Sequence, residues 1–173
     1  MKGFDFFMVK WLRLSKTSMV ISTLIRLYLG FTWLMAGFEK VSSGKFSAEG
    51  MINMAIKNPV KDAGGQPAYD WYTSFLKTIV QPNVGLFNFL VQYGELLIGL
   101  GLILGTLTTA ASFFAMGLNF TYLLAGTIST NPLLLFLEFI ILVAGFNAGK
   151  VGLDRWLVPF LRRKIPFLKK SVE

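Results

Sequence analysis

Residues 84–104 read VGLFNFLVQYGELLIGLGLIL, an apolar run in which Glu95 is the only acidic or basic side chain. A run of about 20 apolar residues is long enough to cross a bilayer as a helix. Three similar stretches, each with a strongly polar residue, lie at about residues 19–38 (Arg26), 109–128 (Asn119) and 132–147 (Glu138). An ionisable group inside such a span costs at least about 2.5–3.5 kcal/mol. The sequence therefore predicts an all-α integral membrane protein, a four-helix bundle with a polar interior.

The composition supports a membrane protein and excludes several kinds of chemistry. The 173 residues are 54% hydrophobic and 15% charged, and the mean hydropathy is +0.58. The net charge of +8 comes from basic residues at the ends of apolar stretches, which predicts contact with anionic lipid headgroups rather than nucleic acid. Without cysteine or histidine we expect no disulfide, haem or metal centre. A redox role would need a bound cofactor or another subunit.

The links between the stretches predict the organisation of the chain. Short links make the last three spans antiparallel neighbours. The long link, residues 41–83, predicts short interfacial helices that cover the bundle end, the second with Trp71, Tyr72 and Phe75 on one side. Residues 1–16 are expected to form an interfacial segment, residues 17–160 the membrane domain and residues 161–173 a basic tail. Because both ends are basic, we expect both termini in the cytoplasm of a bacterial cell and the long link outside.

Helical spacing places the polar residues on inward stripes shared with small residues. The stripes contain Arg26, Gly30, Trp33, Gly37 and Lys40; Gln92, Glu95 and Gly99; Ser112, Ala115, Asn119 and Tyr122; and Glu138, Gly145 and Gly149. Their depths predict the ion pairs Arg26–Glu95 and Lys40–Glu138. Three interpretations follow: the pairs only set helix register, the polar residues form a cavity that binds a head group or moves protons, or a glutamate faces a partner subunit.

Short motifs spread over residues 24–160 resemble a known family. They are Arg26-Leu27-Tyr28-Leu29-Gly30, Ala36-Gly37-Phe38-Glu39-Lys40, Gly94-Glu95-Leu96, Leu104-Gly105-Thr106-Leu107-Thr108, Gly145-Phe146-Asn147-Ala148-Gly149 and Gly152-Leu153-Asp154-Arg155. In this order they resemble the DoxX/DoxD superfamily. The long first link and the chain length are most similar to its DoxD-type branch, the small membrane subunit of thiosulfate:quinone oxidoreductase. The resemblance implies a four-helix membrane fold and a quinone-linked role.

These observations lead to one expected function and its alternatives. We expect a membrane subunit of a quinone-linked oxidoreductase that binds quinone or a similar lipid non-covalently. The expected cofactor-binding residues are Arg26, Trp33, Glu95, Asn119 and Tyr122, and Lys40, Glu138 and Asp154 are expected to be structural or to form a proton path. No catalytic residue is assigned. The expected partners are membrane lipids and a second subunit or copy. The alternatives are a non-enzymatic scaffold or assembly factor that recruits a partner protein, and a small transporter, against which the lack of a broken helix argues.

Overall fold

The computed structural model describes residues 2–165, and the last eight residues of the predicted basic tail lie outside the described residues. The described chain is helical, and beyond an isolated bridge between Lys61 and Pro67 it contains no β-structure. The helices are α1 (Lys2–Leu14), α2 (Lys16–Ser43), α3 (Glu49–Lys57), α4 (Asp70–Phe75), α5 (Val84–Leu104), α6 (Thr108–Leu124), α7 (Asn131–Ala144), α8 (Phe146–Gly149) and α9 (Asp154–Lys164). The all-α prediction is therefore confirmed.

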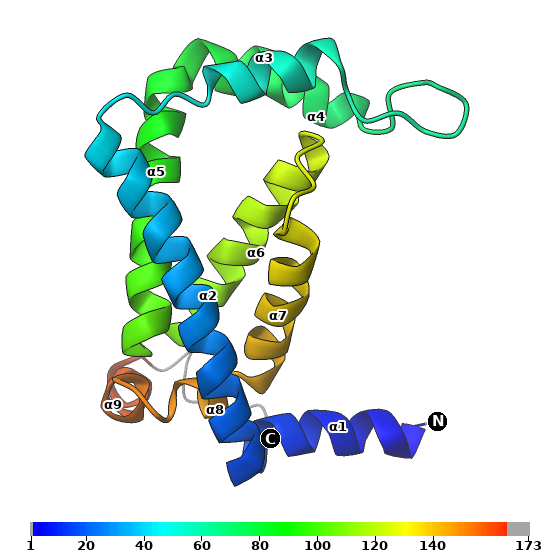
Figure 1. Cartoon of the computed structure of the whole chain (residues 1–173). Helices are drawn as coiled ribbons and strands as arrows, with labels where there is room; N and C mark the ends of the chain where they lie inside the picture. Colours follow the sequence, from blue (N-terminus) through cyan, green and yellow to red (C-terminus); the bar gives the residue numbers. More distant parts are fainter. Residues whose placement is uncertain (1, 166–173) are drawn as a thin grey trace.

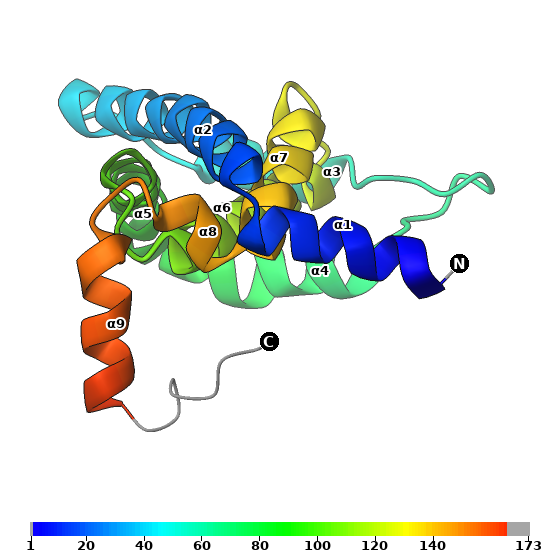
Figure 2. The same ribbon diagram turned by 90° about the horizontal axis from the view of Figure 1, so that it is seen from below.

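The long helices pack as antiparallel neighbours (Figure 1). Helix α2 contacts α5 and α7, and α6 contacts the same two helices. Helices α3 and α4 cover one end of this assembly, which we call the link end, whereas α1, α8 and α9 lie at the other, basic end (Figures 1 and 2). A π-helical turn, Leu76–Val80, and a 3-10 turn, Gln81–Asn83, connect α4 to α5.

The helix lengths distinguish two of the predicted spans from the other two. Among the described residues, α2 and the continuous segment Asp70–Leu104 are long and apolar enough to cross a membrane. Helix α6 has 17 residues and α7 has 14, fewer than the roughly 20 that a perpendicular crossing needs. Helix α7 ends before the predicted residue 147 because Gly145 has a φ of 57°, outside the helical region. Four crossings therefore stay a prediction.

The distribution of side chains is the reverse of that in a water-soluble protein. The most completely buried large side chains include Arg26, Glu95, Asn119 and Glu138, each at most 1% exposed. The outer surfaces of the long helices carry exposed apolar residues, among them Leu24, Phe31, Phe38, Phe89, Leu97, Phe113, Phe120 and Phe136. In water, apolar side chains are buried and charged ones are exposed. An apolar exterior around a polar interior is what a lipid environment requires.

Glycines bring α2 and α5 into close contact. A Cβ added at Gly37 would overlap the backbone of Leu96, and one added at Gly99 would overlap the backbone of Leu34. Small residues at such positions let two helices approach until their backbones touch. This contact brings Lys40, near the end of α2, against α5.

The link forms a second apolar cluster over the link end. Its buried residues are Ala48, Ile52, Ala55, Tyr72, Leu76 and Val80. The Tyr72 hydroxyl donates to the carbonyl of Thr121 at 2.9 Å, which ties α4 to α6. Trp71, predicted on the same side as Tyr72, is instead 64% exposed, because neighbouring residues on a helix point about 100° apart.

Candidate functional site

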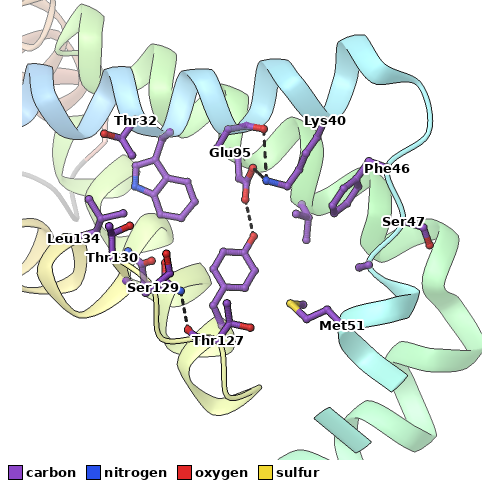
Figure 3. Close-up of a pocket in the computed structure, with 17 residues that line it drawn as sticks. Thr32, Lys40, Phe46, Ser47, Met51, Glu95, Thr127, Ser129, Thr130 and Leu134 are labelled. Carbon is purple, nitrogen blue, oxygen red and sulfur yellow. Dashed lines mark hydrogen bonds and ion pairs between the residues drawn. The ribbon is translucent and has the colours of Figure 1, made fainter. Parts of the chain in front are cut away.

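The polar interior opens into a cavity of about 350 Å³ near the link end (Figure 3). The helices α2, α5, α6 and α7 line it together with the start of the link and the loop between α6 and α7. Most of the exposed area of the wall is apolar, and its apolar residues are Trp33, Ala36, Phe46, Ala48, Met51, Val91 and Leu134. The polar part of the wall consists of Thr32, Lys40, Ser47, Glu95, Asn119, Tyr122, Thr127, Ser129, Thr130 and Asn131. An apolar wall with a few convergent polar groups is typical of small-molecule sites.

Glu95 forms the first polar group in this cavity. Its Oε2 atom lies 2.6 Å from the Nζ of Lys40, and its Oε1 accepts a hydrogen bond of 2.6 Å from the Tyr122 hydroxyl. The Glu95 side chain is 2% exposed, whereas that of Lys40 is 24% exposed. Lys40 also lies over the ring of Phe46, 5.4 Å from its centre. The carboxylate is thus fixed inside the protein, and Lys40 reaches back to it from the side of the link, with its Nζ also 3.5 Å from the carbonyl oxygen of Ala36 (Figure 3).

Glu138 forms the second polar group, directly behind the cavity wall. Its Oε1 accepts from Trp33 Nε1 at 2.8 Å, and Asn119 Nδ2 lies 2.8 Å from both of its carboxyl oxygens. Glu138 is 0% exposed, and among residues 7–165 no cation lies within ion-pair distance of it. Neutral N–H donors alone therefore hold this buried carboxyl group.

Asn119 has one polar atom without a partner. Its Oδ1 is buried and accepts no hydrogen bond within the described chain, while its Nδ2 is held by Glu138. A buried acceptor left unsatisfied costs about 1–3 kcal/mol. Since Asn119 also lines the cavity, this oxygen is suited to accept a hydrogen bond from a bound molecule.

Arg26 and Asp154 belong to a separate structure at the basic end. Arg26 donates through Nη1 to the carbonyls of Leu102 and Ile103 and through Nη2 to that of Val151. Asp154 accepts from the backbone N–H groups of Leu107 and Thr108 at 2.7 and 2.9 Å. The cation thus faces the C-terminus of α5 and the anion the N-terminus of α6, where helix dipoles favour these charges. Both residues clamp the turn between α5 and α6.

The two predicted ion pairs are wrong. Lys40 pairs with Glu95 and not with Glu138, which binds Trp33 instead. Trp33 precedes Lys40 by seven residues, about 10 Å along the helix axis. Arg26 precedes Gly37 by eleven residues, and Gly37 lies against Leu96, next to Glu95. Arg26 and Glu95 are therefore separated by about 17 Å along the helix axis.

The structure brings most of the predicted site residues together. Trp33, Lys40, Glu95, Asn119 and Tyr122 all line one cavity, and Glu138 contacts two of them. Arg26 and Asp154 lie outside this group.

The sequence analysis missed the cavity residues contributed by the connections. They are Phe46, Ser47, Ala48 and Met51 from the link, Thr127, Ser129 and Thr130 from the segment between α6 and α7, and Asn131 at the start of α7. No periodic signal identifies them, because their positions depend on how these connections fold back over the helices.

A family model described as DoxX matches residues 21–128 of the chain. The chain belongs to the DoxX family. The matched region contains all five predicted residues that line the cavity, whereas Glu138 and Asp154 follow it. Neither a curated protein nor a solved structure matches the chain. Together with the apolar exterior of the helices, membership of the DoxX family indicates a membrane protein.

Proposed function

We propose that this DoxX protein is a membrane subunit of a quinone-linked oxidoreductase. In this proposal α2, α5, α6 and α7 cross the membrane as a bundle, and the cavity at the link end receives the head group of a quinone or a similar lipid. The observation that carries the proposal is the convergence of Lys40, Glu95, Asn119 and Tyr122 on one mainly apolar cavity. Its volume of about 350 Å³ is within the range of small-molecule sites.

The cavity residues fit the functional groups of a quinone head. Trp33 and Phe46 offer aromatic surfaces to a flat ring, and Lys40 has an N–H donor to spare for a carbonyl oxygen. The unpartnered Oδ1 of Asn119 suits the hydroxyl group of the reduced form. A bound quinone would supply reversible two-electron chemistry that the side chains of this chain lack.

The role of the protein in this chemistry is to hold the head group and to exchange protons. Glu95 contacts Tyr122 through one oxygen and Lys40 through the other. Lys40, whose side chain is partly exposed, lies between Glu95 and the link end of the molecule (Figure 3). A carboxyl group so placed is suited to accept or release a proton beside the cavity. Glu138 positions Trp33 and Asn119 from behind.

The test is a titration of the purified full chain with a short-chain quinone and its quinol, followed by tryptophan fluorescence, since Trp33 lines the cavity. We expect saturable binding that Asn119→Leu weakens by about three- to tenfold, the effect of losing one hydrogen bond. Tyr122→Phe is the milder second variant, and Phe120→Leu on the exposed side of α6 is the matched control.

The outcomes separate this function from its alternative. If the wild type shows no saturable binding and no quinone copurifies with it, the chain is better described as a scaffold that recruits a partner protein. If binding is saturable but unchanged by Asn119→Leu and Tyr122→Phe, the quinone does not occupy this cavity.

A further inference from the structure

A second recess lies at the basic end, where α5 ends and α9 begins; Figure 2 shows α9 beside α5 at this end. Its volume is about 470 Å³, and its walls include Leu104, Lys150, Val151, Leu153, Arg155 and Trp156. It is more open than the cavity near Glu95. None of its residues takes part in the proposed quinone site.

The backbone around this recess is held in place by specific contacts. Leu153 N–H donates to the carbonyl of Leu104 at 3.0 Å, and Asp154 N–H donates to that of Gly105 at 2.7 Å. The buried Arg26 donates to the carbonyl of Val151 at 2.7 Å. Gly105 and Gly152 touch so closely that a Cβ on either would overlap the other's backbone. Much of the wall is the loop of residues 150–153 between α8 and α9, and these contacts hold that loop against the end of α5.

The charge around the recess is positive and has no counter-charge within the described chain. Lys150 and Arg155 line it, and Arg162 shares the ring of Phe146 with Lys150, each cation 5.5 Å from the ring centre. Among the side chains of residues 7–165, the ion pair is that of Lys40 with Glu95. Asp154, the nearest acid in sequence, has both oxygens on α6 backbone N–H groups. An anion is therefore the complementary ligand.

The rest of the recess wall is apolar and continues onto the membrane-facing side of α5. Val151, Leu153 and Trp156 are 49%, 46% and 66% exposed. Leu97, Leu100 and Leu104 follow one another on one exposed face of α5, at the helical spacing of three and four residues. Tryptophan beside basic residues is typical of the level of lipid headgroups. A ligand with a negative head and an apolar tail matches this surface.

We propose that the recess between α5 and α9 binds the phosphate headgroup of an anionic phospholipid, with Lys150 and Arg155 contacting the phosphate and the acyl chain lying along α5. Basic recesses between membrane helices bind anionic headgroups in this way. This site does not depend on quinone binding at the other end.

The experiment is native mass spectrometry of the full chain in mild detergent, titrated with phosphatidylglycerol or phosphatidylcholine of the same acyl chains. The test variant is Lys150→Gln with Arg155→Gln. The control variant is Lys57→Gln with Lys61→Gln, which removes the same charge from exposed positions on the link. Each basic residue near an anionic lipid changes its affinity by about fivefold. We therefore expect the test variant to bind phosphatidylglycerol about 30-fold more weakly and the control variant to bind it as the wild type does.

Several results would overturn the proposal. The wild type could bind the two lipids with equal affinity, or the control variant could lose as much affinity for phosphatidylglycerol as the test variant. Inorganic phosphate could also displace phosphatidylglycerol, which would indicate a site for a free anion. If the test variant does not fold, a second measurement uses the wild type and the single variant Trp156→Phe. Brominated phosphatidylglycerol in vesicles should quench the fluorescence of Trp156, defined by comparison with Trp156→Phe, more than brominated phosphatidylcholine does. Equal quenching by the two lipids would also refute the site.

Discussion

The contact between Lys40 and Glu95 allows a quantitative test of the polar interior. Lys40→Met would leave the Glu95 carboxylate, 2% exposed, with only the Tyr122 hydroxyl as a partner. Removing one partner of a buried ion pair costs about 3–5 kcal/mol. Glu95→Gln should cost less, about 1.5–3 kcal/mol for a lost hydrogen bond to a charged group. The reason is that Lys40, 24% exposed, can keep its charge in contact with water.

The double variant should reveal the coupling between the two residues. With both changes no charge is stranded, so the total cost should be at least about 2 kcal/mol below the sum of the single costs. The measurement is the free energy of unfolding in mixed micelles, followed by circular dichroism. A control cycle uses Lys57→Met and Glu49→Gln, exposed residues that form no ion pair with each other, and should be additive. Additive costs for Lys40 and Glu95, or a smaller cost for Lys40→Met than for Glu95→Gln, would refute the reasoning.

Two further predictions concern helix packing and orientation. Gly99→Ala should lower the free energy of unfolding by about 1–3 kcal/mol through overpacking, because the added Cβ would overlap α2. Gly94→Ala is the control on the same helix: its Cβ meets no atom within 4 Å, so the change should be neutral or stabilising. Equal effects of the two changes would contradict this packing. For the predicted orientation, a cysteine replacing Asp62 should react with a membrane-impermeant reagent added to intact cells, and one replacing Lys164 should not. The reverse pattern would invert the topology.

The residues of the candidate site differ in how far the sequence could identify them. Trp33, Glu95, Asn119 and Tyr122 are identified because each lies on a helix stripe shared with small residues. The structure buries the first three and leaves Tyr122 half-buried. Arg26 was identified by the same pattern, yet it binds the carbonyls at the end of α5. A stripe shows that a side chain points inward, but the depth and contacts of its partner depend on neighbouring helices.

The sequence alone determined that the chain is helical, that it belongs with the DoxX family and that its polar side chains face inward. These properties follow from local composition and from the period of 3.6 residues. Only the tertiary structure decided which charges meet. The close contact at Gly37 and Gly99 places α2 against α5, so that Lys40 reaches Glu95 and leaves Glu138 to Trp33 and Asn119. Such pairings depend on the relative heights of helices far apart in the sequence, and residue spacing within one helix carries no information about those heights.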